Sequence, residues 1–183
     1  MSKWKEEIFR CDICGINEKK ADDIGNINAK VLIVAQSPAP VDNTIKNEDI
    51  VPFNFFAKKE DKKRGEVILD NMVNLLGLTI NDFYLVNVIK CCVKNVNKKY
   101  IENCKNKFLV REIQNMKNLE AIICLGSIAK NTILDIMQNN YIDGKVKLCF
   151  LYHPGYIVRN GYRKDLMDDF FNKIKEFKKR IDL

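Results

Sequence analysis

Short apolar runs alternate with longer amphipathic stretches along most of the chain. Four runs carry β-branched and other apolar residues at both odd and even positions: KVLIVAQ (30–36), FYLVNVI (83–89), EAIICLG (120–126) and VKLCFLY (146–152). Runs of this kind are typical of parallel strands that are covered on both faces. We therefore predict four buried strands at these positions.

The stretches between and after these runs repeat apolar residues at spacings of three and four, as in helices with one buried face. The clearest stretch closes the chain, with Leu166, Phe170, Ile174, Phe177 and Ile181. Three others are expected around residues 68–76, 101–116 and 127–138. This alternation predicts an α/β fold, a three-layer sandwich in which helices flank a central four-stranded, mainly parallel sheet.

The chain is long enough for one compact domain with a hydrophobic core and too short for two ordinary ones, so we expect a single domain over residues 1–183. Lys3, Glu6 and Glu7 stand where a signal peptide needs its apolar region, and no apolar run approaches the length of a membrane span. We therefore expect a cytoplasmic protein without membrane contact. A formal net charge of +7 is compatible with a polyanionic partner but does not require one.

Ligands of such sheets collect at the carboxyl ends of the strands, which here means the loops opened by Gln36, Lys90, Gly126 and His153. His153 is the only histidine of the chain, and the Pro-Gly pair that follows it predicts a sharp corner at this edge of the sheet. The long polar segment 37–64 follows the first strand, and loops of this length are usually functional or mobile. The sequence therefore predicts a functional site at this edge.

Seven cysteines in a cytoplasmic protein indicate metal or cluster ligation, or simple burial, rather than a disulfide framework. Cys11 and Cys14 have the spacing at which two thiolates reach one metal from a tight turn, within an N-terminal segment of about residues 1–29. Cys91 and Cys92 directly follow the second strand, and Cys104 lies on the next helix. Adjacent residues point in different directions, so only one of the Cys91–Cys92 pair is expected to be a ligand. Four thiolates suit a structural zinc or an iron-sulfur cluster, and spacing alone does not separate the two.

Several stretches together, in collinear order, resemble the family 4 uracil-DNA glycosylases, the iron-sulfur members of that superfamily. They are the Cys-x-x-Cys motif at 11–14, VLIVAQSPAP (31–40), PF (52–53), YLVNVIKC (84–91), NCKNKFL (103–109), AIICLG (121–126) and LYHPGYIVRN (151–160). The resemblance covers nearly the whole chain. It implies a monofunctional glycosylase that flips uracil out of DNA and uses water to hydrolyse its N-glycosidic bond, leaving an abasic site. The partner would be uracil-containing DNA, and we expect a monomer.

The same resemblance implies that Cys11, Cys14, Cys91 and Cys104 hold a 4Fe-4S cluster in a structural role, which favours a cluster over zinc. In the base pocket it implies that Phe53 stacks on uracil and that the amide of Asn87 pairs with the O4 and N3-H edge. An asparagine inside an apolar strand needs a bonding reason even without the resemblance.

His153 matches the family histidine that hydrogen-bonds O2 of the base as negative charge develops on the leaving uracil. The resemblance also implies a loop that enters the minor groove and fills the gap left by the flipped nucleotide, formed by Tyr156, Ile157 and Arg159.

The first family motif usually reads Gly-Glu-x-Pro-Gly, whereas residues 35–39 read Ala-Gln-Ser-Pro-Ala. The amide of Gln36 can orient a water molecule but cannot remove a proton from it. Asp42 lies where the family carries a further acid and is expected to supply the charge. An alternative is an iron-sulfur DNA-binding relative whose base excision is weak, lost or altered. A third interpretation is a zinc-stabilised α/β protein whose pocket takes a nucleotide or another small ligand.

Overall fold

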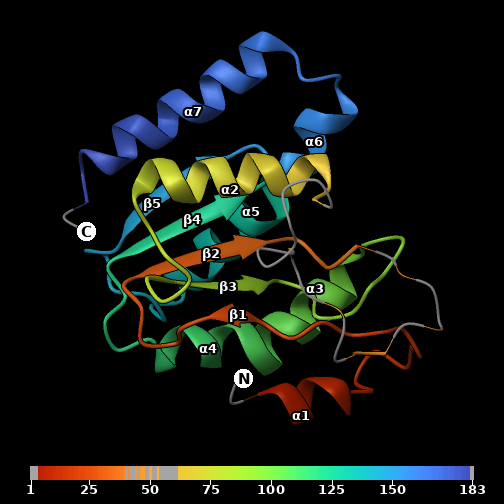
Figure 1. The fold of residues 1–183 in the computed structure, drawn as a ribbon. Helices are drawn as coiled ribbons and strands as arrows, with labels where there is room; N and C mark the ends of the chain where they lie inside the picture. Colours follow the sequence, from red (N-terminus) through yellow and green to blue (C-terminus); the bar gives the residue numbers. More distant parts are fainter. Residues whose placement is uncertain are drawn as a thin grey trace.

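A computed structural model describes residues 4–39, 41, 44, 46, 47, 50, 53 and 62–181 of the chain. In this described part the strands form one five-stranded sheet in the order β1-β3-β2-β4-β5 (Figure 1). The strands are β1 (Ile24–Gly25), β2 (Val31–Ala35), β3 (Phe83–Asn87), β4 (Ala121–Leu125) and β5 (Lys147–Leu151). The last four are mutually parallel and lie inside the four predicted runs, which confirms the α/β fold and the mainly parallel sheet.

The predicted number of four strands was wrong by one edge strand. β1 runs antiparallel to β3 and pairs Ile24 with Leu85 and Gly25 with Tyr84. A strand of two residues cannot display a hydrophobic period, so the sequence pattern could not reveal it.

Helices cover both faces of the sheet and make the expected three layers (Figure 1). One face carries α2 (Arg64–Leu76), α6 (Pro154–Arg159) and α7 (Lys164–Lys178). The other face carries α3 (Lys98–Cys104), the π-helical turn η3 (Lys105–Leu109), α4 (Val110–Asn115) and α5 (Ser127–Gln138). Within the described part of the chain, none of the helices is long and apolar enough to cross a lipid bilayer.

The four parallel strands have apolar residues on both faces because each of them contributes to two separate hydrophobic cores. In β2, Val31, Ile33 and Ala35 pack toward α2 and α7, whereas Leu32 and Val34 pack toward α4 and α5. All five are fully buried, and burying one such aliphatic side chain is worth about 1.5–3 kcal/mol. This packing fixes the sheet and therefore the relative positions of the strand ends.

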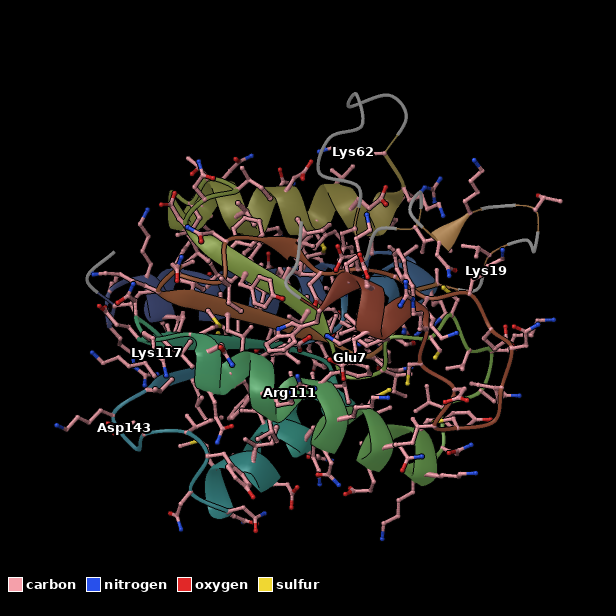
Figure 2. All side chains as sticks on the ribbon, turned by 90° about the horizontal axis from the view of Figure 1, so that it is seen from below. Glu7, Lys19, Lys62, Arg111, Lys117 and Asp143 are labelled. Carbon is pink, nitrogen blue, oxygen red and sulfur yellow. The ribbon has the colours of Figure 1, made fainter. Side chains whose placement is uncertain are left out.

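The N-terminal segment contacts the rest of the domain through α1 and through the residues that precede β1. Helix α1 (Lys5–Phe9) packs Ile8 against Phe108, and Arg111 of α4 lies 4.4 Å from the ring centroid of Trp4. Arg111 also pairs with Glu7 at 2.9 Å, and the two side chains lie side by side in Figure 2. Further along, residues 19–21 pair with the chain just after β3: the Cys92 N–H donates to the Lys19 carbonyl, and the Ala21 N–H donates to the Lys90 carbonyl.

A buried ionic cluster, which the sequence pattern did not predict, joins the N-terminal segment, β3 and α4. Lys90 is only 1% exposed, and its Nζ lies 2.8 Å from Asp23 and 2.7 Å from Glu112. The Tyr84 hydroxyl donates to the second oxygen of Asp23 at 3.0 Å. Burial lowers the pKa of the Lys90 ammonium, but the Asp23 and Glu112 carboxylates outweigh this and raise it. Burial and the neighbouring Asp23 raise the pKa of Glu112 well above its usual value.

Candidate active site

His153 lies at the turn between β5 and α6, at the carboxyl end of the sheet. Pro154 occupies the first helical position, where its missing N–H costs nothing and its fixed φ favours the helix. His153 caps this helix, since its Nδ1 accepts a hydrogen bond from the backbone N–H of Gly155 at 3.0 Å. The His-Pro-Gly sequence therefore makes the predicted corner, and it fixes the imidazole at the edge where ligands of α/β sheets bind.

The cap also decides the protonation state of the ring. A neutral imidazole carries its proton on one nitrogen and accepts with the other, so a ring that accepts at Nδ1 carries its proton on Nε2. Burial, followed by the positive charge of Arg159, lowers the pKa of His153 to about 4. At neutral pH the side chain is therefore an uncharged donor through Nε2–H.

Gly126, at the end of β4, allows the neighbouring turn to approach His153 closely. It adopts φ = 90° before α5, and its backbone N–H donates to the Leu151 carbonyl at 2.8 Å. A Cβ added at Gly126 would lie 3.3 Å from the Cβ of His153. Both the left-handed φ and the close approach require glycine here.

A cavity of about 460 Å³ opens beside the imidazole. Gln36 reaches it from the end of β2, Lys130 from α5, His153 and Arg159 from the α6 region, and Lys173 from α7. Every charged residue in the described lining is basic. Lys173 pairs with Asp169 at 2.7 Å, whereas Lys130 and Arg159 have no acidic partner among the described residues. The cavity is therefore suited to an anionic or electron-rich ligand.

Phe53 and Asn87 do not line the cavity themselves but lie near its residues His153 and Gln36. The ring centroid of Phe53 lies 6.1 Å from that of His153, and Phe53 is half-buried. Asn87 ends β3 in register with Ala35 of β2, directly beside the residue that precedes Gln36. Asn87 is 2% exposed, and its Oδ1 has no hydrogen-bond partner among the described residues. A buried acceptor left unpaired is costly, so Asn87 Oδ1 has capacity for one further hydrogen-bond donor.

The residues predicted to contact DNA are placed differently from one another. They lie on the short helix α6 instead of the expected loop. Tyr156 and Arg159 are exposed, whereas Ile157 is fully buried in the core with α2 and α7. The placement of Ile157 does not agree with a direct contact to DNA, because its side chain packs in the core instead of facing solvent. Asp42 lies outside the described residues.

Three residues at the cavity were not singled out from the sequence: Tyr152, Lys130 and Lys173. Tyr152 directly precedes His153, and this adjacency was the available signal. Lys130 lies on the first turn of α5, four residues after Gly126. Lys173 lies on the polar face of α7. Only the spacing of the apolar residues in this helix carried a prediction, so the sequence pattern did not single out Lys173.

Four cysteines lie in one neighbourhood where the N-terminal segment meets the chain after β3 and the end of α3. The thiol of Cys91 is within electrostatic reach of Cys11, Cys14 and Cys104, and burial raises its pKa to about 12. The Nδ2–H of Asn103 donates to Sγ of Cys14 at 3.4 Å. Cys92 points elsewhere: it packs with Ala21 and Ile50.

The spacing of these four thiols bears on what they could hold. A tetrahedral zinc with bonds of about 2.3 Å needs sulfur atoms only about 3.8 Å apart. Among the residues that the structure describes, no three Cys, His, Asp or Glu side chains are arranged to hold one metal ion. Four thiols in one neighbourhood are a donor set that suits an iron-sulfur cluster as well as zinc.

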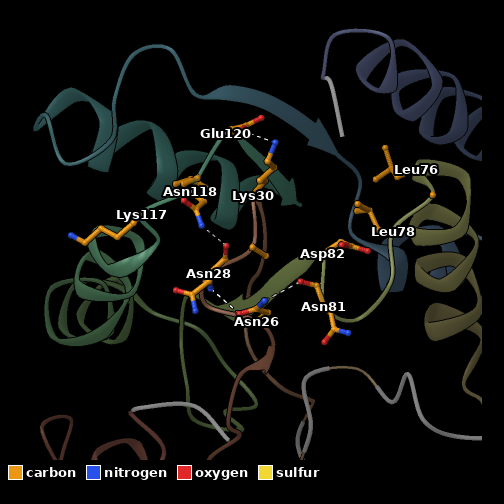
Figure 3. A pocket seen from close by; sticks show the side chains of 13 residues that line it. Asn26, Asn28, Lys30, Leu76, Leu78, Asn81, Asp82, Lys117, Asn118 and Glu120 are labelled. Atoms are coloured by element: carbon orange, nitrogen blue, oxygen red, sulfur yellow. Dashed lines mark hydrogen bonds and ion pairs between the residues drawn. The ribbon is translucent and has the colours of Figure 1, made fainter.

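A larger cavity of about 750 Å³ lies at the opposite end of the strands (Figure 3). Its polar groups largely satisfy each other: Lys30 pairs with Glu120 at 2.9 Å, and the Asn118 amide donates to the Asn28 carbonyl at 3.0 Å. It lies at the amino ends of β2, β3 and β4, where sheets of this kind do not place ligands. The smaller cavity at His153 is therefore the candidate active site.

Known proteins resemble the chain over nearly its full length. Residues 23–176 match the family model described as "Uracil DNA glycosylase superfamily". The type-4 uracil-DNA glycosylase of Archaeoglobus fulgidus is 27% identical, and the alignment covers 93% of this chain and 89% of that protein. The type-4 uracil-DNA glycosylase of Pyrobaculum aerophilum is 24% identical over 97% of this chain and 96% of its own length. The solved structure of Pedobacter heparinus SMUG2 aligns with a TM-score of 0.48 and 16% identity over 82% of this chain and 75% of its own.

The family match includes all five strands, the Gly126 turn and the corner at His153. It also spans far more than half of the chain. The protein therefore belongs to the uracil DNA glycosylase superfamily.

Proposed function

We propose that this protein is a DNA repair glycosylase that removes uracil from DNA by hydrolysing the N-glycosidic bond, leaving an abasic site. The observation that carries the proposal is the half-buried, uncharged imidazole of His153, whose Nδ1 is held by Gly155 so that Nε2–H is the available donor. The names of the curated relatives, type-4 uracil-DNA glycosylases, support the same reaction.

The donor of His153 would act where charge appears. Breaking the bond between sugar and base leaves negative charge on the uracil, and a hydrogen bond to O2 strengthens as that charge grows. The corner fixes the donor before the reaction, so no reorganisation is needed in the transition state. The basic side chains of Lys130 and Arg159 add a favourable field in the same cavity.

Phe53 and Asn87 would bind the flipped base. A phenyl ring provides a stacking face for any base, so Phe53 holds the base without identifying it. Asn87 supplies identity, because its Oδ1 can accept the N3–H of uracil while its amide N–H donates to O4. The unpaired Oδ1 means that uracil satisfies a group that the free protein leaves unsatisfied.

Gln36 would position the attacking water through its side-chain amide. It lies in the described lining of the cavity, but an amide cannot remove a proton. Asp42 is still expected to supply the negative charge near the water and the sugar. With the usual acid replaced by Gln36, stabilisation of the leaving uracil would carry more of the rate.

Cys11, Cys14, Cys91 and Cys104 would hold a 4Fe-4S cluster. The support is the donor set of four thiols in one neighbourhood, together with the match to relatives named type-4 uracil-DNA glycosylases, whereas zinc is the alternative metal. When bound, the cluster would crosslink the N-terminal segment to the chain after β3, through Cys91, and to the end of α3, through Cys104. It takes no part in hydrolysis in this proposal.

Uracil-containing DNA would approach the edge of the sheet that bears α6, where the exposed Tyr156 and Arg159 are available for contact. Ile157 is not assigned a contact because it is buried. A single domain over residues 1–183, a monomeric state and a cytoplasmic location stay predictions from the sequence.

The test is release of uracil from a labelled oligonucleotide with one deoxyuridine, using anaerobically purified protein and alkali to cut the abasic product. Two variants separate the roles of the histidine. His153→Asn keeps a side-chain acceptor for Gly155 N–H and so preserves the helix cap, but it removes the Nε2–H donor. His153→Ala removes both.

We expect both variants to lose uracil release, and only His153→Ala to lose about 1 kcal/mol of stability with the cap. Wild-type protein with an intact cluster that binds DNA but releases no uracil would instead support the second candidate, a DNA-binding relative. The observation that favours this candidate is Gln36 at the place of the usual acid.

A further inference from the structure

Two exposed tyrosines are stacked on each other at the mouth of the candidate active site. The ring centroids of Tyr152 and Tyr156 lie 5.5 Å apart with an interplanar angle of 23°. Tyr152 is 40% exposed and Tyr156 is 42% exposed. They are two of the four large hydrophobic residues that the described part of the chain exposes, and both line the cavity beside His153. A paired aromatic surface of this kind marks a binding site more often than scattered exposure does.

The charged residues that line the cavity beside this pair are basic, although Lys173 is paired with Asp169. Nζ of Lys173 lies 5.6 Å from the ring centroid of Tyr152, and Lys130 and Arg159 line the same cavity. The last two have no acidic partner among the residues that the structure describes. Aromatic faces next to unpaired cations are the combination with which proteins bind single-stranded nucleic acid, because bases stack on the rings while the cations follow the phosphates.

The arrangement suits an unpaired strand better than a duplex. A protein that fills the gap in a duplex uses a projecting apolar side chain as a wedge. On α6 the apolar side chain next to Tyr156 is Ile157, and it is turned into the core and fully buried. The two tyrosine rings lie against each other instead of projecting. Bases of a single strand can turn a face to such a pair without breaking base pairs.

We propose that the stacked Tyr152–Tyr156 pair binds the face of the nucleobase next to the excised uracil in single-stranded DNA, so that unpaired DNA is the preferred substrate. This inference rests on the proposed glycosylase function. It assigns Tyr152, together with Tyr156, the role of determining strand preference at the same site.

The first experiment compares single-turnover uracil release from one deoxyuridine oligonucleotide, alone and annealed to a complement. The variants are Tyr152→Ala and Tyr156→Ala, with Tyr152→Phe and Tyr156→Phe to keep the stacking face. Tyr141→Ala is the matched control, because Tyr141 is equally exposed at 48% but lies outside the cavity.

We expect wild-type protein to release uracil faster from the single strand. Each alanine variant should lower the ratio of single-strand to duplex activity by about tenfold, the loss expected for one stacked base. The phenylalanine variants and Tyr141→Ala should keep the wild-type ratio. An unchanged ratio in both alanine variants would overturn the proposal.

A second readout does not depend on catalysis. The fluorescent base 2-aminopurine is placed next to a 2′-fluorinated deoxyuridine, which resists cleavage, and stacking on tyrosine quenches its emission. Quenching that disappears in Tyr152→Ala and Tyr156→Ala supports the stacking pair even if no uracil is ever released, an outcome that would overturn the glycosylase function alone. Uracil release with quenching that survives both alanine variants would overturn the stacking pair and leave the glycosylase standing.

Discussion

The backbone N–H of Gly155 donates to Nδ1 of His153 at 3.0 Å, and this one bond determines which nitrogen of the imidazole can face a substrate. With Nδ1 occupied as an acceptor, the neutral ring must carry its proton on Nε2. A side chain that caps a helix thus becomes a donor with fixed direction. The short sequence His-Pro-Gly provides the cap, the helix start and the tautomer together.

His153 should titrate far below an ordinary histidine. Burial and Arg159 lower its pKa to about 4, so the ring stays neutral in the folded protein well into the acid range. Nitrogen-detected NMR of the imidazole should show a proton on Nε2 and a midpoint near pH 4. Because His153 is the only histidine of the chain, the signal needs no assignment.

The lowered pKa of His153 also makes the stability of the folded protein depend on pH. Between the usual pKa of 6.5 and about 4, the unfolded chain binds a proton that the folded protein excludes. Stability should therefore fall as the pH drops from about 6.5 to 4, and His153→Asn should show less of this loss. An imidazole midpoint near 6.5 would contradict both expectations.

Gly126→Ala should impair the site through His153. The residue needs φ = 90°, and its new Cβ would press on the Cβ of His153 at 3.3 Å. We expect a loss of about 1–3 kcal/mol in unfolding free energy from the strained backbone, with uracil release reduced further than this loss explains. Gly144→Ala is the control, since nothing lies within 4 Å of its added Cβ and its φ is not left-handed. Equal activity of the two variants would show that the close approach does not position the imidazole.

Asn87→Ala should separate function from stability. Its Oδ1 is buried without a partner, so removing the amide relieves an unsatisfied group and the melting temperature should stay the same or rise. Uracil release should fall by roughly 10²-fold or more if the amide recognises the base edge. Asn74→Ala, at an exposed position of α2, should change neither property. A large loss of stability in Asn87→Ala would show that the amide has a structural role instead.

The sheet could be predicted from the sequence because its strands are covered on both faces, which produces continuous apolar runs that few other elements show. The short elements could not: β1 has two residues and α6 has six, too few for a hydrophobic period. The sequence predicted a sharp corner at His153 but a loop after it, although Pro154 is favourable at the first position of a helix.

Apart from the residues named through the family resemblance, such as Gln36 and Phe53, the site was predicted only where a residue type is unusual in its surroundings. Asn87 in an apolar strand and the single histidine were conspicuous, and the structure places both at the same edge of the sheet. Lys90 and Glu112 were not, because charged residues are expected at the surface and their pairing depends on contacts between distant segments. Tyr152 and Lys130 could not be predicted for the same reason, since only their contacts with distant segments place them at the cavity.

Substitution of Cys91 should remove the cluster, whereas substitution of the adjacent Cys92 should not. Cys91 lies within electrostatic reach of Cys11, Cys14 and Cys104, whereas Cys92 packs with Ala21. Cys91→Ala should lose the brown colour, the visible absorption and most of the iron and sulfide. Cys92→Ala should keep all of them. Zinc measured in the same samples is the control, and stoichiometric zinc in place of iron in wild-type protein would contradict the cluster.

The buried cluster of Lys90, Asp23 and Glu112 should respond unequally to two substitutions that each remove one ionisable group. Lys90→Met leaves Asp23 and Glu112 without their cation and should cost about 3–5 kcal/mol in unfolding free energy. Glu112→Gln should cost less, because burial and Asp23 raise the pKa of Glu112 and so make its ionised form less favourable in the folded protein than in the unfolded chain.

The pH dependence provides the control for this difference. A raised pKa means that ionisation of Glu112 in the unfolded chain, above its usual value of 4.5, works against folding. Glutamine has no such ionisation, so the free energy of unfolding of Glu112→Gln should rise relative to that of the wild type between pH 5 and pH 8. Urea unfolding measures this difference, with the iron content checked in each sample. A constant difference over this range would show that Glu112 is ionised in the folded protein. Lys90 would then balance two full negative charges, and Glu112→Gln should prove as costly as Lys90→Met.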